Sequence, residues 1–299
     1  MFAQIMAPAM RRDVLLAAAD RSPQLLVHEE GEYAGPVAAT ELGIPWVTHA
    51  WGCPLRSHDD LVQLECDAEP LWQQAGLDVP PAAGLYAHGV VDPCPPFLQA
   101  TRPGVARAWA LRPETLQLSG RLPSTEALPE GLLAYVRFGT VPLFAGAPDE
   151  LSAAVEACIA NGLGAVVTTS NDAVRQKLVA AHADRVAVSS FVSFPDLLPR
   201  CRVVVCHAGA GTVLAALAAG VPLVLVPRGA PSQMRMAEAC EAARVAITVP
   251  PSDLVRLSAA VSMAIDEARV GRASLAAEQI HAMPSADELV PALETIANS

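Results

Sequence analysis

One stretch of this sequence, residues 201–238, constrains the fold more than any other. It opens with an apolar run up to Cys206, which is typical of a strand buried on both faces. Residues 207–212, His-Ala-Gly-Ala-Gly-Thr, form a turn whose two glycines let the backbone bend sharply and approach a ligand closely. A Leu- and Ala-rich helix follows, ended by Gly220, and residues 223–226 form a second apolar strand. This order predicts a right-handed βαβ unit.

The turn at 207–212 predicts an anion-binding site, because the free N–H groups at the start of the following helix point toward it. A Walker A loop is excluded, since no Lys-Ser or Lys-Thr pair follows Gly211. The dinucleotide fingerprint also fails, because the third glycine and the acidic residue at the end of the next strand are both missing. What remains is His207 beside a phosphate-binding turn, and the plain alternative is a structural turn in an ordinary α/β protein.

Composition limits the class of protein. The chain has 299 residues, 52% of them hydrophobic, which is enough for two domains and too apolar for disorder. A net charge of −11 argues against nucleic acid or an anionic membrane as a partner. Seven cysteines without a CxxC pair predict reduced thiols, and neither a signal peptide nor an apolar run of ~18 residues is present. We therefore expect a cytoplasmic protein without integral membrane association.

The pattern HAGAGTxxxAxxxGxPxxxxP over 207–227 resembles the donor-binding signature of nucleotide-sugar glycosyltransferases of the GT-B fold. More narrowly, it is similar to the actinobacterial enzymes that glycosylate macrolides, anthracyclines and related natural products. Residues 22–52, SPQLLVHEEGEYAGPVAATELGIPWVTHAWG, also resemble part of the acceptor-binding domain of these enzymes. The resemblance implies an α/β, GT-B-like protein with two Rossmann-like domains built on parallel sheets.

The chain alternates helices and strands twice, with a break between the two series. Residues 113–131 are rich in Pro, Gly, Ser and Glu and show neither helical nor alternating periodicity, so we place the linker there. We expect a partial acceptor-binding domain over 1–118 and a donor-binding domain over 119–284. The resemblance implies that a final helix, 285–299, packs back toward the N-terminal domain.

The resemblance also implies a set of residues that hold the donor diphosphate. Gly139 and Thr140, at the end of a predicted strand, match a phosphate contact, although a plain βα turn is the alternative. His207 is expected over the diphosphate, where it donates a hydrogen bond or a positive charge. The helix start is expected to contribute N–H groups and one hydroxyl, through Gly209, Ala210, Gly211 and Thr212. These groups would stabilise a leaving nucleoside diphosphate without a metal or another cofactor.

Two further matches concern the base and the sugar of the donor. Val192 matches a loop whose backbone pairs with the pyrimidine base, the alternative being a loop that only packs on the core. Ser232 and Gln233 fall where the family has an Asp-Gln pair, once Pro231 is treated as an insertion. Because the carboxylate is lost, we expect weaker recognition of hexose hydroxyls, which favours either a deoxysugar or an altered register at this position.

The start of the chain departs from the family, whose members begin with a strand and a Gly-His loop that carries the catalytic base. Nothing before Gln24 resembles this unit, so the N-terminal domain is expected to lack roughly 60–90 residues and to expose a sheet edge. Glu29 matches the carboxylate that orients the missing His, the alternative being a solvated acid at a strand end. His28 and His49 border the same region and are weaker candidates for a replacement base.

The sequence thus favours a glycosyltransferase, inverting and metal-independent, that moves a (deoxy)sugar from a dTDP- or UDP-sugar to a hydroxyl of a small hydrophobic aglycone. The second hypothesis is a catalytically inactive, truncated protein that binds nucleotide sugars or acts as an auxiliary partner. A third is another GT-B enzyme, such as a sugar-nucleotide epimerase or a cell-wall glycosyltransferase. Whether the chain forms a homodimer is left open.

Overall fold

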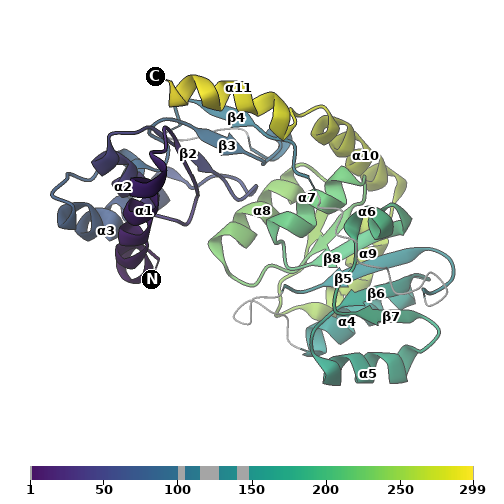
Figure 1. Ribbon diagram of the computed structural model, residues 1–299. Helices are drawn as coiled ribbons and strands as arrows, with labels where there is room; N and C mark the ends of the chain where they lie inside the picture. The colour runs from purple at the N-terminus through teal and green to yellow at the C-terminus, as the bar shows by residue number, and fades with distance from the viewer. Residues whose placement is uncertain (1, 100–104, 115–127, 140–147, 299) are drawn as a thin grey trace. The chain divides into compact units, whose positions relative to one another are not determined.

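The computed structural model describes residues 2–99, 105–114, 128–139 and 148–298, and the chain divides into two compact units (Figure 1). Unit 1 comprises Met1–Arg112 and Met283–Ser299, and unit 2 comprises Pro113–Ala282. Each unit contains one wholly parallel sheet with helices against it, which confirms the α/β class. The assignment of acceptor binding to one domain and donor binding to the other stays a prediction.

Unit 1 has a four-stranded sheet in the order β1-β2-β3-β4. Its strands are β1 (Leu26–Glu29), β2 (Trp46–His49), β3 (Val90–Asp92) and β4 (Ala108–Ala110). Its helices are the π-helix η1 (Phe2–Met6), α1 (Ala7–Arg21), α2 (Ala34–Leu42), α3 (His58–Gln74), the 3-10 turns η2 (Pro81–Gly84) and η3 (Pro96–Leu98), and α11 (Ala286–Ala297). Gly43 ends α2 with φ +66°, as its position after an apolar helix predicts. The sequence did not predict β3, which lies within a Pro-rich stretch.

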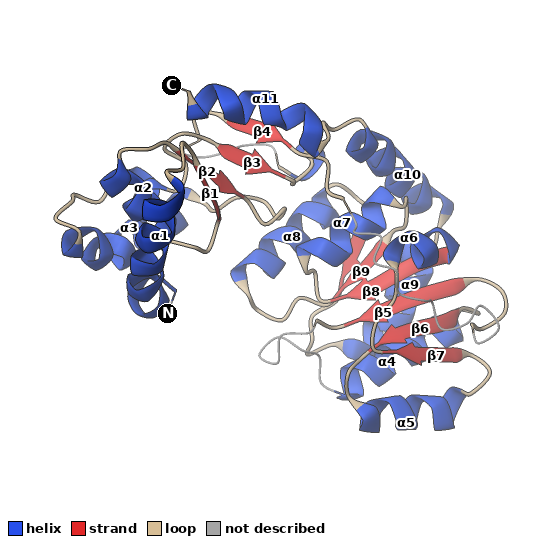
Figure 2. Ribbon diagram, in the orientation of Figure 1, coloured by secondary structure: helices blue, strands red, loops and turns tan. Residues whose placement is uncertain are grey.

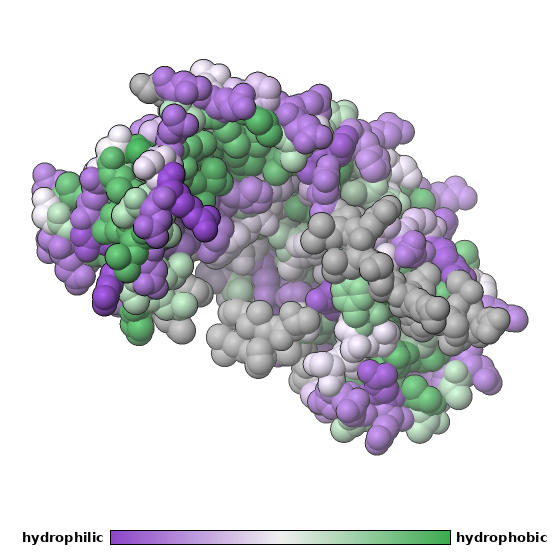
Figure 3. Space-filling model, in the orientation of Figure 1, coloured by the Kyte–Doolittle hydropathy of each residue, from purple (hydrophilic) through white to green (hydrophobic). Residues whose placement is uncertain are grey.

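The sheet of unit 1 is covered by different helices on its two faces (Figure 2). On one face, α2 and α3 contribute to a core that also contains Val90. On the other, Leu289 and Ile296 of α11 pack against Val47 and Val91. β1 forms one edge of the sheet, and its Val27 is 52% exposed. Figure 3 shows apolar surface on this unit between α11 and α1.

Unit 2 has six parallel strands in the order β10-β9-β8-β5-β6-β7. They are β5 (Leu133–Arg137), β6 (Gly164–Thr168), β7 (Val186–Ser189), β8 (Cys201–Cys206), β9 (Leu223–Leu225) and β10 (Ala246–Thr248). The helices are α4 (Pro148–Ala160), α5 (Asp172–His182), α6 (Phe194–Leu197), α7 (Ala210–Ala218), α8 (Pro231–Ala242), α9 (Leu257–Ala264) and α10 (Glu267–His281), with 3-10 turns η5 (Leu198–Arg200) and η6 (Leu254–Arg256). This is the doubly wound order, and it confirms the Rossmann-like parallel sheet that was expected for this part of the chain.

The strand order of unit 2 locates its binding edge. Within unit 2, the chain passes from β5 through β6 to β7 at one edge of the sheet. It then returns to β8 on the other side of β5 and continues to β10 at the other edge. In doubly wound folds, ligands bind beyond the carboxyl ends of the strands where this reversal occurs. For unit 2 that point lies between β5 and β8. Over the part of the chain that is described, no helix is long and apolar enough to cross a bilayer.

Candidate functional site

The reversal point of unit 2 brings together residues far apart in the sequence. Arg137, the last residue of β5, lies opposite Cys206, the last residue of β8. Gly139 and His207 follow these two strand ends, so two of the predicted residues belong to the same edge of the sheet. Gly139 has φ +66°, a conformation that favours glycine and turns the chain beyond the strand. Thr140, the other half of this predicted contact, lies outside the described residues.

The turn between β8 and α7 leaves backbone donors free. Ala208 has φ +65°, which is uncommon for a residue with a side chain and which is often found at binding sites. Gly209 is the N-cap of α7. Among the described residues, no acceptor takes the N–H of Ala210 or Gly211. The Thr212 N–H, in contrast, donates to the Gly209 carbonyl at 3.1 Å, so α7 already uses this predicted donor. The free N–H groups at a helix start form an anion-binding position.

His207 lies beside these free donors. Burial lowers the pKa of His207, the Arg137 guanidinium lowers it further, and the Arg137 carbonyl opposes the shift. Its Nδ1 is nevertheless buried and has no hydrogen-bond partner among the described residues. The ring is held close to the turn, because a Cβ added to Gly209 would meet His207 Nε2 at 2.7 Å. At neutral pH this is therefore an uncharged ring, and Nε2 is the ring nitrogen that lies next to the turn.

Val192 follows β7, at the same carboxyl edge but two strands from β5. Its side chain is buried, 4% exposed, so the packing role holds for the side chain. Its N–H and carbonyl have no partner in the described part of the chain. The backbone groups expected to pair with a base are therefore available.

Ser232 and Gln233 stand in the first turn of α8, and they differ in what they can offer. Ser232 is partly exposed, whereas Gln233 is buried and its Oε1 accepts the Arg228 N–H at 2.8 Å. The side chain of Gln233 thus already holds the loop that precedes the helix. Met236, one turn further along α8, is fully buried and accepts a contact from the Cys240 thiol at 3.7 Å.

Sequence reasoning missed three charged residues at this edge. Arg228 forms an ion pair with Glu150, which joins the loop before α8 to the first turn of α4, 78 residues away in the sequence. Arg137 ends β5, next to His207. A charged residue directly after an apolar strand was the available signal for Arg137. The pairing of Arg228 with Glu150 has no comparable signal, because it depends on the tertiary fold.

In unit 1, Glu29 lies exposed at the end of β1. Its Oε2 accepts the Gly31 N–H at 2.8 Å and also the indole N–H of Trp51. A pocket of about 120 Å³ borders the carboxylate and is lined in part by Met6, Met10 and Tyr33. A largely apolar pocket beside a carboxylate can hold a small hydrophobic group with a hydroxyl.

The ring of His28 is held in place by hydrogen bonds within unit 1. Its Nε2 lies 2.9 Å from the Thr48 hydroxyl and its Nδ1 lies 2.8 Å from the Glu32 carbonyl, so both ring nitrogens are engaged. Burial lowers the pKa of His28. The next acid along, Glu30, is completely buried and pairs with Arg56 Nε at 3.4 Å. His28 is therefore not available as a replacement base.

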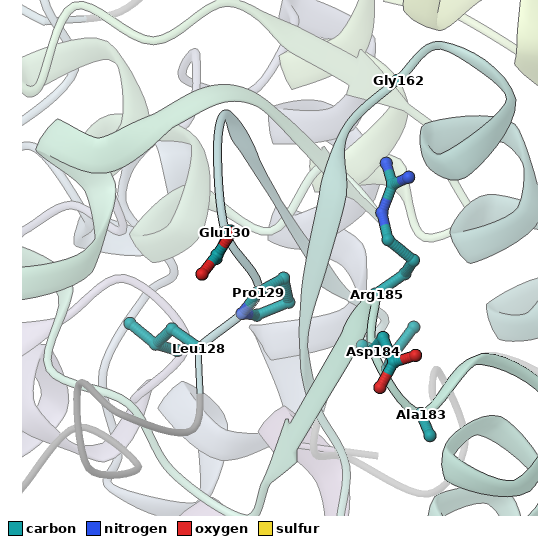
Figure 4. A pocket seen from close by; sticks show the side chains of 8 residues that line it. Leu128, Pro129, Glu130, Gly162, Ala183, Asp184 and Arg185 are labelled. Carbon is teal, nitrogen blue, oxygen red and sulfur yellow. The ribbon is translucent and has the colours of Figure 1, made fainter.

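A larger pocket lies away from the candidate site. It has a volume of about 770 Å³ and is lined by residues that precede β5, β6 and β7, including Glu130, Gly162 and Arg185 (Figure 4). Arg185 donates to the Leu163 carbonyl at 3.0 Å. This is the amino edge of the sheet, opposite the edge where ligands bind in doubly wound folds. In the described residues, no group of three or more His, Cys, Asp or Glu side chains is arranged to hold a metal ion.

Comparison with known proteins identifies relatives of the chain. Residues 158–296 match the family model "Erythromycin biosynthesis protein CIII-like, C-terminal domain". The chain is 30% identical to the L-demethylnoviosyl transferase of Streptomyces niveus over 259 residues, which cover 81% of this chain and 62% of that relative. It therefore spans less than two thirds of that relative's length.

Solved structures with the same fold include two glycosyltransferases. The spinosyn rhamnosyltransferase SpnG matches 98% of this chain and 78% of its own, with a TM-score of 0.79 and 24% identity, and it has also been solved with thymidine diphosphate. The Streptomyces sp. SF2575 glycosyltransferase SsfS6, in complex with thymidine diphosphate, matches 97% of this chain and 74% of its own, with a TM-score of 0.72 and 25% identity. Residues 158–296 thus match the erythromycin biosynthesis protein CIII-like C-terminal domain, in a chain whose fold is that of GT-B natural-product glycosyltransferase structures.

Proposed function

We propose that unit 2 binds a nucleoside diphosphate sugar and that the chain is an inverting, metal-independent glycosyltransferase. It transfers a (deoxy)sugar from a dTDP- or UDP-sugar to a hydroxyl of a small natural-product aglycone. The observation that carries the proposal is a set of donors at the reversal point that have no partner among the described residues: the N–H groups of Ala210 and Gly211 beside His207. The thymidine diphosphate complexes of SpnG and SsfS6 support a nucleoside diphosphate as the ligand.

These donors suit the chemistry of the leaving group. In the proposed reaction, the acceptor oxygen bonds to the anomeric carbon while the bond from that carbon to the diphosphate oxygen breaks, which inverts the configuration. Negative charge develops on the departing diphosphate. The helix N–H groups and His207 stabilise that charge by hydrogen bonding. We propose a reaction that needs no metal, because the groups at this position donate hydrogen bonds to anions, whereas Mg²⁺ sites use carboxylate oxygens.

The sugar and the base are assigned more broadly. The free backbone groups of Val192 support contact with a pyrimidine base. Ser232 offers a hydroxyl to the sugar, but Gln233 has its carbonyl oxygen committed to Arg228. Fewer polar groups therefore remain for sugar hydroxyls, which favours a deoxysugar. The odd number of cysteines, seven, and the lack of a CxxC pair in the sequence favour a reducing, cytoplasmic location.

Acceptor activation is assigned to Glu29 in unit 1. Its Oε2 carries both observed hydrogen bonds, and the pocket beside it is largely apolar. The carboxylate accepts the proton of the acceptor hydroxyl, directly or through a bound water, as the new bond forms. The apolar part of the lining favours a small hydrophobic portion of an aglycone next to the reacting hydroxyl.

Calorimetric titration of the 299-residue chain with dTDP and UDP tests the donor site. We expect at least one of the two to bind, and His207→Ala to weaken that binding by about 10-fold or more. Absence of binding by both nucleotides in a folded chain would contradict the proposal. Unchanged affinity in His207→Ala would remove the diphosphate from this turn.

A second candidate, a donor-binding protein that transfers no sugar, is favoured by one observation. His28 has both nitrogens engaged, and Glu29 already accepts two hydrogen bonds, so unit 1 holds its polar groups tightly. Incubation with dTDP-sugars and a panel of aglycones, followed by mass spectrometry, separates the two. A glycosylated product that is lost in Glu29→Gln supports the enzyme. Nucleotide binding with no product from any aglycone supports an auxiliary partner.

A further inference from the structure

Arg137 projects from the sheet of unit 2 toward the helices that cover its binding edge. It lies opposite Cys206 in the register, and paired residues of parallel strands point to the same face. That face is the α8 face, because the Cys206 and Cys240 thiols interact electrostatically. The alternate residues Ala134 and Val136 enter the core on the other face, with α4 and α9. Figure 2 shows α7 and α8 together on one side of the sheet.

The guanidinium of Arg137 is positioned by the buried side chain of Tyr135. It hydrogen-bonds the hydroxyl of Tyr135, and that hydroxyl lies 2.9 Å from the Thr168 hydroxyl. Tyr135 is completely buried, and its ring packs edge-on against Phe194 with 5.6 Å between centroids. A guanidinium has several donors in a rigid plane, so one contact with Tyr135 fixes its direction and leaves other N–H groups for a ligand.

The charge of Arg137 is not compensated within the described part of the chain. No carboxylate there pairs with it, whereas Arg228 pairs with Glu150. Arg137 is only partly exposed, so its charge is less well solvated than that of a surface arginine. The neighbouring ring does not share this charge, since burial and Arg137 both lower the pKa of His207.

We propose that Arg137 binds the donor diphosphate and supplies the positive charge of the site, while His207 contributes a hydrogen bond from a neutral ring. The inference rests on the proposed function. A guanidinium can form two parallel hydrogen bonds to phosphate oxygens. The N–H groups at the start of α7 suffice for one phosphate, so Arg137 makes the site selective for a diphosphate over a monophosphate.

The test is titration of the full chain with dTDP, dTMP and inorganic pyrophosphate. Arg137→Gln is expected to weaken dTDP binding about 10- to 100-fold and dTMP binding less. Arg137→Lys should retain part of the affinity, and added salt should weaken the wild type more than Arg137→Gln. The matched control is Arg202→Gln, an arginine near the opposite end of β8, which should leave all three affinities unchanged.

Each outcome bears on a different claim. If the wild type binds dTDP and Arg137→Gln binds it equally well, the role of Arg137 is overturned and the proposed function stands. Equal losses for dTDP and dTMP, together with failure of Arg137→Lys to bind, would assign Arg137 to the fold instead. If the wild type binds neither dTDP nor UDP, the proposed function fails. Pyrophosphate binding that depends on Arg137 would then still support the anion role.

Discussion

At the carboxyl edge of the sheet in unit 1, His28 uses both ring nitrogens, whereas His207 at the corresponding edge in unit 2 leaves Nδ1 without a partner among the described residues. The charged groups differ in the same way. Glu30 of unit 1 is buried against Arg56, while Arg137 of unit 2 has no paired carboxylate in the described part. Because unsatisfied polar groups are costly, groups without a partner among the described residues at this edge support the proposal that a polar ligand binds there.

The contrast also indicates what unit 1 can bind. Its polar edge groups hold one another, as in the contacts of Glu29 with Trp51 and of Asp92 with Gln99. A ligand there gains little from new hydrogen bonds and more from burial of apolar surface. This agrees with a hydrophobic acceptor for unit 1 and a charged donor for unit 2.

The largest predicted effect comes from replacing His28 of unit 1 and His207 of unit 2 with leucine, one at a time. His28→Leu removes buried hydrogen bonds and should destabilise unit 1 by about 2–3 kcal/mol. All four tryptophans lie in unit 1, so their fluorescence during denaturation measures this directly. His207→Leu should leave that transition in place and abolish most dTDP binding. Comparable losses of stability from both substitutions would break the comparison.

The next largest effect is the loss of stability of unit 2 when the ion pair of Arg228 with Glu150 is removed. Both side chains are largely buried, with 21% and 11% exposure, so Glu150→Ala leaves a poorly solvated cation. We expect a loss of about 1–3 kcal/mol, measured by hydrogen exchange in β5 and β9. Tryptophan fluorescence should not change. If hydrogen exchange in β5 and β9 were as slow in Glu150→Ala as in the wild type, the ion pair would contribute nothing to the stability of unit 2.

Replacing Gly211 or Gly271 with alanine distinguishes an effect on the stability of unit 2 from an effect on dTDP binding. A Cβ would meet nothing within 4 Å at Gly211, in the first turn of α7, or at Gly271, in α10. Alanine at either helical position should stabilise unit 2 by about 0.5–1 kcal/mol. Only Gly211→Ala should weaken dTDP binding, because its methyl group occupies the space over the helix start. Equal dTDP affinity in the two variants would place the ligand elsewhere.

The fold could be predicted from the sequence where burial decides the pattern. The apolar runs at β5, β6 and β8 have one interpretation, as strands covered on both faces. β3 was missed because it has only three residues in a Pro-rich segment that carries no periodicity. The start of α7 at Ala210 has no helical signal, because Ala210 and Gly211 are small and the first large apolar side chain of the helix is that of Val213.

The candidate site was predictable only in part. The turn at 207–212 carries its own signal, because glycines beside a strand end and a helix start are local features. The proximity of Arg137 to His207 arises from the return of the chain to the other side of β5, which brings β8 beside it. Two hydrogen bonds occupy groups that were expected to bind the ligand, and both depend on the folded geometry. The Thr212 N–H donates to the Gly209 carbonyl, and the Arg228 N–H donates to Gln233 Oε1.

The smallest predicted effect is a pH dependence that differs between the units. Burial lowers the pKa of both His28 and His207, so in the folded chain each stays neutral at a pH where the unfolded chain, with a pKa of about 6.5, takes up a proton. Stability is then fully present above about pH 6.5 and is lost as the pH falls toward the lower folded values.

Bound diphosphate should distinguish the two histidines. In unit 2, the anion favours protonation of His207, so dTDP should reduce the loss of stability below about pH 6.5. In unit 1, His28 is enclosed by Thr48 and the Glu32 carbonyl, so its pH dependence should remain with dTDP present. Denaturation at pH 7.5 and pH 5.5, followed by fluorescence for unit 1 and hydrogen exchange for unit 2, measures both. If dTDP left the pH dependence of unit 2 unchanged, His207 would not contact the diphosphate, and the two edges would differ in hydrogen bonding without differing in function.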